Sequence, residues 1–119
     1  MLNVANIGGN ISGTIQTKTT AQNRIGETET TWSDSVAVRG WLGLQTGGNA
    51  RSNFNAKIEE SSHVFLMDYN SGVYALADRD ARMIIKGFVY DVLLIDNPDE
   101  MDEQIEIYLR RVGAWNGGQ

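Results

Sequence analysis

The stretch Arg82-Met-Ile-Ile-Lys-Gly-Phe-Val-Tyr-Asp-Val-Leu-Leu-Ile-Asp96 carries the most regular pattern in the chain. Met83 and Ile85 lead into Lys86-Gly87, a pair typical of a tight turn, and an apolar segment follows. In that segment apolar side chains fall on both faces of an extended chain: Tyr90, Val92 and Leu94 on one, Val89, Leu93 and Ile95 on the other. Such a strand is usually central in a small barrel or sandwich. The stretch therefore predicts a β-hairpin within a mainly β fold.

The first half of the chain predicts further strands. All eight threonines lie there, and β-branched residues favour a pleated, half-buried surface. Residues 12–20 and 27–32 alternate around the turn signal Asn23-Arg-Ile-Gly26, which predicts a hairpin over residues 12–32. A third strand is expected from Val36 to Leu44, and the strand pattern resumes between Lys57 and Asp68.

The end of the chain fits two structures equally well. Pro98 and the acidic residues after it favour a helix start, and Met101, Ile105, Leu109 and Val112 have helical spacing. Against that, Ile105, Ile107 and Leu109 alternate with polar or amphipathic residues, which is a strand pattern. Local physics leaves both alternatives open.

Composition removes several classes of protein. The 119 residues fit one domain, and the absence of cysteine excludes disulfide scaffolds, thiolate zinc sites and cysteine nucleophiles. The net charge of −5 makes an autonomous nucleic-acid binder a poor candidate. Apolar runs are too short for a membrane-spanning helix, and the start lacks the pattern of a signal peptide, so we expect a protein made and kept in a cytoplasm unless an assembly carries it out.

Charge is unevenly distributed along the chain. Residues 1–58 hold five basic and three acidic residues, whereas residues 59–119 hold five basic and twelve acidic ones. Half of those twelve lie between Asp96 and Glu106. The run is either a solvated face or a docking surface that orients copies of the chain.

Residues that could carry chemistry are few. His63 is the single histidine, and in a strand it is expected to be a hydrogen-bonded structural residue rather than a base. The acidic run lacks the spacing of a calcium loop, and the glycine pairs match no phosphate-binding loop. Trp32 and Trp41 are expected in the core, and Trp115 on a partner. The sequence therefore predicts no enzyme, cofactor or metal site.

Several segments, in this order, resemble one family. They are Gly13-Thr-Ile-Gln-Thr-Lys-Thr19, Asn23-Arg-Ile-Gly-Glu27, Glu29-Thr-Thr-Trp32, the run from Asp80 to Val92, Ile95-Asp-Asn-Pro98 and Glu106-Ile-Tyr-Leu-Arg-Arg-Val112. The sequence is similar to head–tail joining, or head-closure, proteins of long-tailed bacteriophages. The resemblance implies a small SH3/OB-like β-barrel of about six to seven antiparallel strands with long loops. It also favours a turn at Pro98–Asp102 and a closing strand from Gln104 to Val112.

The resemblance implies a domain layout and a role in assembly. The expected layout is an N-terminal arm at residues 1–11, one domain at 12–113 and a flexible tail at 114–119. Such proteins form rings beneath the portal that close the filled head and attach the tail, so the expected location is the virion, after assembly in the host cytoplasm. Expected partners are further copies of the chain, portal or adaptor and tail proteins, and packaged DNA, with no membrane.

The resemblance also suggests contact residues. The loop Gln45–Asn55 has no periodicity, and Arg51 and Phe54 are its natural contacts with a partner or with DNA. Asp99, Glu100, Asp102 and Glu103 are expected to meet a basic surface on a neighbour. Two alternative functions stay open: a tail-completion or terminator protein, and an OB-like module that binds single-stranded nucleic acid.

Overall fold

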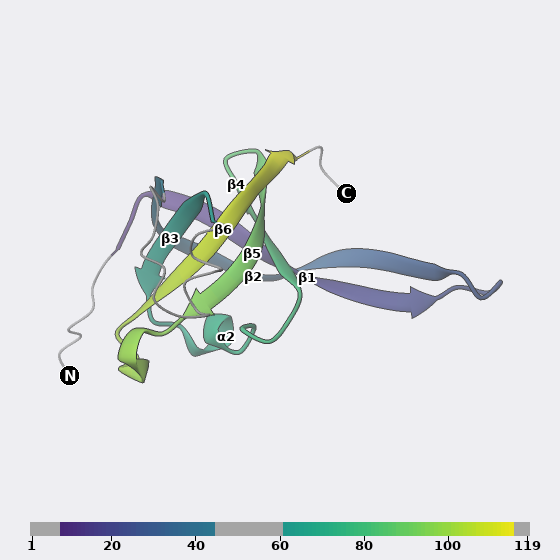
Figure 1. Cartoon of the computed structure of the whole chain (residues 1–119), viewed down its shortest axis with the longest axis horizontal. Helices are drawn as coiled ribbons and strands as arrows, with labels where there is room; N and C mark the ends of the chain where they lie inside the picture. Colours follow the sequence, from purple (N-terminus) through teal and green to yellow (C-terminus); the bar gives the residue numbers. More distant parts are fainter. Residues whose placement is uncertain (1–7, 45–60, 116–119) are drawn as a thin grey trace.

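A computed structural model describes residues 8–44 and 61–115, which form one antiparallel sheet of six strands that closes on itself (Figure 1). The strands are β1 (Ile11–Gln22), β2 (Thr28–Leu44), β3 (His63–Asp68), β4 (Ala81–Ile85), β5 (Phe88–Asp96) and β6 (Gln104–Ala114). Their order around the closed sheet is β1-β2-β3-β6-β5-β4, with β4 paired back to β1. The predicted mainly β fold is confirmed, with six strands in the described residues.

Apolar side chains from all six strands fill the inside of the closed sheet. Phe65, Met83 and Ile107 have no solvent exposure, and they come from β3, β4 and β6. The full set of buried apolar residues is Ile15, Val38, Phe65, Met67, Val73, Ala81, Met83, Ile85, Tyr90, Ile95, Ile105, Ile107 and Leu109. One contiguous core therefore holds the sheet together, as expected for a small single domain.

The β4–β5 hairpin forms as the opening stretch predicts. Lys86 and Gly87 both have positive φ, 51° and 82°, which is the backbone of a two-residue type I′ turn. Ile85 pairs with Phe88 directly beside the turn, and Arg82 pairs with Asp91 at the far end of the ladder. The turn is thus built in the geometry that matches the twist of its strands.

Beyond the middle of β5, the predicted alternation of faces is wrong. The pairing of β5 with β6 shifts between Val92 and Leu94, which is a β-bulge. Tyr90 and Ile95 are therefore both buried although five positions separate them. A regular strand would have placed these two side chains on opposite faces.

The residues from 28 to 44 form one strand instead of the two that the sequence predicts. Ile15 on β1 pairs with Val36, and Gln16 pairs with Asp34, so Ser35 is the extra residue of a bulge. The bulge bends β2 without ending it. Residues 33–35, which lie between the two expected strands, are part of this single strand.

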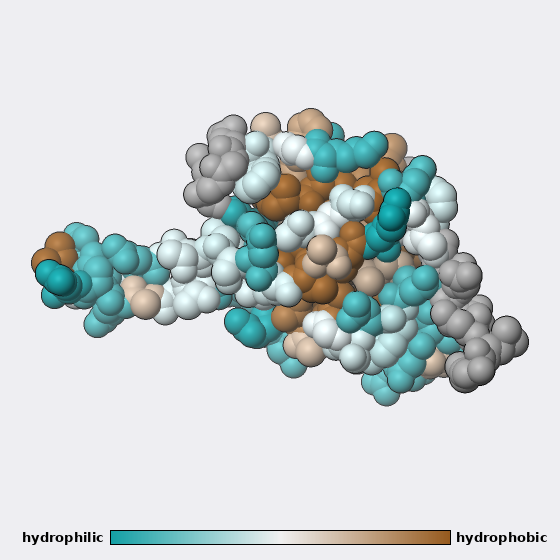
Figure 2. All heavy atoms as spheres, turned by 180° about the vertical axis from the view of Figure 1, so that it is seen from behind, coloured by the Kyte–Doolittle hydropathy of each residue, from teal (hydrophilic) through white to brown (hydrophobic). Residues whose placement is uncertain are grey.

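The outer halves of β1 and β2 leave the closed sheet together. Pairing of β1 with β4 ends at Thr17, and β2 pairs with β3 only from Trp41 to Leu44. Residues 18–32, here called the hairpin extension, project from the sheet as a two-stranded ribbon (Figure 1). In Figure 2 this ribbon is hydrophilic except near its end, while hydrophobic side chains gather on the sheet beside its base.

The closed sheet is tightly packed at Gly40, directly before β2 begins to pair with β3. A Cβ atom at Gly40 would collide with the carbonyl oxygen of Leu66 and lie 2.9 Å from the Phe65 ring. At Gly43, three residues further along β2, the nearest atom would be 4.0 Å away. Only hydrogen fits at Gly40, whereas Gly43 has room for a methyl group.

The C-terminal part forms the strand alternative. A 3₁₀ turn, η1 (Pro98–Glu100), precedes β6, which pairs with β3 on one side and with β5 on the other. The buried residues Ile105, Ile107 and Leu109 have the period of two that the strand reading requires. The turn and the closing strand implied by the family resemblance are confirmed.

The connection between β3 and β4 contains a short helix, α2 (Ser71–Tyr74). The Asn70 side-chain oxygen caps it by accepting hydrogen bonds from the backbone of Gly72 (2.8 Å) and Val73 (3.2 Å). Val73 is fully buried and closes one end of the core. None of the helices in residues 8–44 and 61–115 could span a membrane.

Candidate functional site

The predicted acidic contact residues lie together in the connection between β5 and β6. Asp99, Glu100 and Asp102 are exposed, and Glu103 is half-buried. Met101, in the middle of this acidic loop (residues 97–103), is 60% exposed. The structure therefore presents the four carboxylates in one solvent-facing loop, as their proximity in the sequence predicts.

The backbone of the acidic loop adopts an unusual conformation. Asp99, Glu100 and Asp102 have positive φ values of 55°, 52° and 59°, a region that residues with side chains rarely adopt. The buried Asn97 holds the loop: its Nδ2 donates to Asp102 Oδ1 (2.8 Å), and its Oδ1 accepts from the Asp102 backbone (3.1 Å). Asn97 before Pro98 is a turn signal, but the positive φ values could not be predicted from it.

Negative charge is concentrated at the base of the acidic loop. Burial raises the pKa of Asp96, and the neighbouring carboxylates of Glu106 and Asp99 raise it further, against a backbone hydrogen bond from Asn97. Glu106 accepts hydrogen bonds from the Tyr108 hydroxyl (2.8 Å) and from Gln104 Nε2 (3.0 Å). Burial, and then the bond to Glu106, raise the pKa of the Tyr108 hydroxyl well above its usual range. A cationic partner would relieve the repulsion among these carboxylates.

His63 has the hydrogen-bonded environment expected of it. Its Nδ1 lies 2.9 Å from Ser62 Oγ, and its ring meets Tyr90 edge-on with centroids 5.2 Å apart. Ser62 Oγ also accepts a hydrogen bond from the Arg111 backbone. Burial, and then the charge of Arg111, lower the pKa of His63. These contacts tie β3 to β6 and favour the neutral imidazole.

A buried polar network, which the sequence analysis does not predict, lies at the base of the hairpin extension. Arg82 on β4 is only 9% exposed, and its Nε donates to Gln16 Oε1 at 2.8 Å. Gln16 in turn donates from Nε2 to Asp34 Oδ1 at 2.8 Å. The Trp32 ring covers the Arg82 guanidinium at 4.4 Å. Burial lowers the pKa of Arg82, with Asp91 acting against it. An arginine opening an apolar strand was the signal available in the sequence.

The predicted core position is wrong for Trp41. That side chain is 46% exposed, because Gly40 rather than Trp41 faces the inside of the closed sheet. Trp32 is half-buried and covers Arg82 at the outside of the sheet. Trp115, expected on a partner, is 37% exposed.

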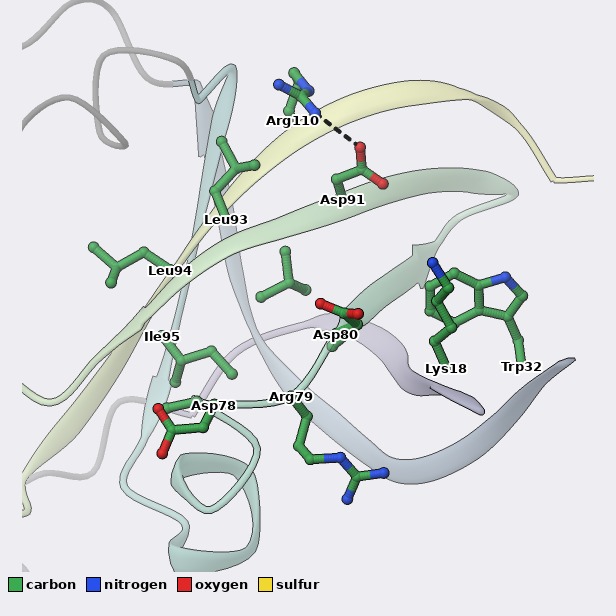
Figure 3. A pocket seen from close by; sticks show the side chains of 13 residues that line it. Lys18, Trp32, Asp78, Arg79, Asp80, Asp91, Leu93, Leu94, Ile95 and Arg110 are labelled. Atoms are coloured by element: carbon green, nitrogen blue, oxygen red, sulfur yellow. Dashed lines mark hydrogen bonds and ion pairs between the residues drawn. The ribbon is translucent and has the colours of Figure 1, made fainter. Parts of the chain in front are cut away.

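A groove of about 480 Å³ opens where the hairpin extension leaves the closed sheet (Figure 3). Three segments form its walls: residues 77–81, residues 91–95 of β5, and the base of the extension with Lys18 and Trp32. Arg110 on β6 pairs with Asp91 at 3.1 Å along one wall. These segments are far apart in sequence, so sequence patterns could not have brought them together.

Two predicted contact residues, Arg51 and Phe54, lie outside the residues that the structure describes. Their assignment stays a prediction. Within residues 8–44 and 61–115, no group of three or more His, Cys, Asp or Glu side chains is placed to hold a metal ion.

A family model described as phage head completion protein matches residues 13–112, which run from β1 into β6. No curated protein sequence matches the chain.

Proposed function

Because the chain belongs to the phage head completion protein family, we propose that it forms a ring at the head–tail interface below the portal. The ring closes the filled head and provides the surface to which the tail attaches. The observation that carries this proposal is the family match over residues 13–112, which include nearly all of the closed sheet. The chain then acts at the head–tail junction of the virion after assembly in the host cytoplasm.

The shape of the chain supports a ring. A ring of identical subunits needs two different faces on each subunit that fit one another. The hairpin extension projects from one end of the closed sheet, and the acidic loop lies elsewhere on it, between β5 and β6 (Figure 1). The closed sheet supplies the rigid part between these features.

The acidic loop is the proposed electrostatic contact. Asp99, Glu100, Asp102 and Glu103 would face a basic surface on the next subunit or on an adjoining ring. The pKa of Asp96, raised by burial and then by the charges of Glu106 and Asp99, supports this, because a cationic neighbour would lower it. Binding to heads should weaken between about 50 and 500 mM salt, and Asp99→Lys with Glu100→Lys should weaken it at low salt. Binding that is unaffected by salt and by the two charge reversals would contradict the contact.

Arg51 and Phe54 are the proposed contacts of the loop Gln45–Asn55. This loop would contact a neighbour or packaged DNA in the channel. Arg51→Glu should reduce head–tail attachment, and Arg51→Lys, which keeps the charge, should reduce it less. Full attachment with Arg51→Glu would remove Arg51 from the interface.

The decisive experiment is deletion of this chain from the phage that encodes it. We expect tailless heads, restored to infectious particles by the chain supplied in trans. Electron microscopy of the restored particles should show a ring of density between portal and tail. Heads that join tails normally without the chain would disprove the function. Joined heads with a defect at the end of the tail would favour the tail-completion alternative instead.

A further inference from the structure

Beyond its base, where Lys18 N–H donates to the Asp80 carbonyl oxygen (3.1 Å) and Trp32 covers Arg82, the hairpin extension is exposed to solvent. Residues 18–22 on β1 and 28–31 on β2 are all exposed. A two-stranded ribbon without packing on either face is marginally stable in water. An element of this length that buries so little is therefore well suited to bury its surface against a second molecule.

Hydrogen bonds to Asn23 define the turn at the end of the extension. The backbone of Asn23 donates to the Glu27 carbonyl oxygen (2.8 Å) and accepts from the Gly26 backbone (3.1 Å). Its side-chain oxygen accepts from the backbones of Ile25 (3.0 Å) and Glu27 (2.9 Å). These bonds fix a turn whose outermost apolar side chain, Ile25, is 77% exposed. Arg24 stands exposed beside it.

Apolar and acidic side chains both line the groove at the base of the extension, together with the cations Lys18, Arg79 and Arg110. β4 pairs with β5 only up to Asp91, so from Val92 onward β5 is bonded to β6 on one side alone. Leu93 and Leu94, half-buried, line the groove along this open stretch. Across from them, Asp78 and Asp80 are exposed on the segment before β4 (Figure 3).

A chain cannot place its own tip in its own groove. Lys18, where the extension begins, lines the groove, and the turn starts five residues further on. At about 3.3 Å per residue the ribbon carries Ile25 roughly 17 Å or more away from that point. A tip that fills such a groove must therefore belong to another molecule.

We propose that the tip of the hairpin extension of one copy occupies the groove of a second copy. Ile25 packs against Leu93 and Leu94, and Arg24 lies beside Asp78 and Asp80. Tip and groove are different surfaces, so the contact is heterologous and can repeat from copy to copy around a ring. The inference rests on the proposed ring function and identifies the element that joins its subunits.

Cysteine cross-linking tests the contact directly, because the chain contains no cysteine of its own. Phage particles are assembled with the double variant Ile25→Cys, Leu94→Cys and oxidised. A ladder of covalent multimers is expected. The control pair is Ile25→Cys with Met101→Cys, because Met101 is 60% exposed and lies in the acidic loop. Specific docking should make the first pair react at least about tenfold faster than the control.

The outcomes separate the contact from the function. A ring in the particles with equal cross-linking of both pairs would overturn the docking and leave the ring standing. Products that stop at the dimer would support the docking but contradict the ring. If the chain is absent from the particles, the proposed function fails and the inference fails with it.

Charge reversal gives a second test that leaves the fold intact, since all the residues concerned are exposed. Arg24→Glu should lower the rate of Ile25–Leu94 cross-linking at least about tenfold, and adding Asp78→Lys and Asp80→Lys should restore it. Lys86→Glu makes the same charge change at the β4–β5 turn and serves as the control. An unchanged rate with Arg24→Glu, or no recovery with the charge swap, would overturn the proposed arrangement.

Discussion

β1 and β2 pass through two environments. From Gly13 to Thr17, β1 has β2 on one side and β4 on the other, and Ile15 is fully buried. From Thr19 to Thr31 the same two strands pair only with each other, and residues 19–22 and 28–31 are exposed. The ladder of backbone hydrogen bonds is continuous through both parts. What differs is burial, so stability should be concentrated in the closed sheet and contact with partners in the extension.

The largest expected difference in stability is between variants of two apolar residues, one in the closed sheet and one at the tip of the extension. Phe65→Ala in the closed sheet should lower the free energy of unfolding by about 3–5 kcal/mol, because it removes a fully buried ring. Ile25→Ala at the tip should change it by no more than about 0.5 kcal/mol. Urea unfolding of the purified chain measures both. A comparable loss from the two variants would mean that the extension belongs to the cooperative core.

A smaller difference in stability is expected between variants of two glycines on β2, where this strand approaches β3. Gly40→Ala should cost about 3 kcal/mol, because its Cβ has no space against the Leu66 carbonyl and the Phe65 ring. Gly43→Ala, on the same strand with open space, should be close to neutral. Thermal unfolding followed by circular dichroism distinguishes them. Equal melting temperatures for the two variants would refute the close approach of β2 and β3.

The junction between the two regions depends on Arg82. Arg82→Met keeps the apolar length of the side chain but leaves Gln16 Oε1 without its donor, and it should cost about 1–2 kcal/mol. The variant should also speed amide hydrogen exchange in residues 18–32, because Trp32 loses the guanidinium beneath it. Arg82→Lys keeps the charge without the planar guanidinium and should recover the exchange rates only in part. Exchange in the extension that is the same in both variants and in the parent chain would show that Arg82 does not anchor it.

The smallest expected effect is on the pH dependence of the melting temperature. The pKa of His63 in the folded chain is lowered by burial and by Arg111, so the unfolded chain binds the proton more readily. The stability that the neutral imidazole contributes is present above the unfolded pKa of about 6.5 and is lost as the pH falls through the folded pKa. His63→Asn should therefore reduce the drop in melting temperature between about pH 7.5 and pH 5. A drop of the same size in the variant would contradict the shift.

The parts of the fold that could be predicted depend on local signals. Lys86-Gly87 between apolar strands was sufficient for the β4–β5 hairpin, because turn type and strand pattern agree there. The three bulges, at Ser35, at Val112 of β6 and in the middle of β5, could not be predicted, because each follows from the fit to a neighbouring strand. The last strand was undecided locally, since the same residues satisfy both periods; pairing with β3 and β5 selects the strand.

In the candidate site, too, one part could be predicted from local sequence and the other parts could not. The acidic loop is contiguous in sequence and could be identified from the run Asp96–Glu106 alone. The contact between Gln16 and Arg82 joins residues 66 positions apart, and the groove combines three distant segments. Such arrangements depend on closure of the sheet, which local patterns do not contain.

The strand order also determines when each strand can find its partners during synthesis. β1 and β2 can pair as soon as both have left the ribosome, but the partner on the other side of β1 is β4, about 65 residues later. β3 and β5 each wait for β6, the last strand, before their second edge is covered. Until Gln104–Ala114 emerges, both edges are open templates for pairing with other chains. A nascent chain stopped before β6 should therefore aggregate rather than accumulate as a shorter folded domain.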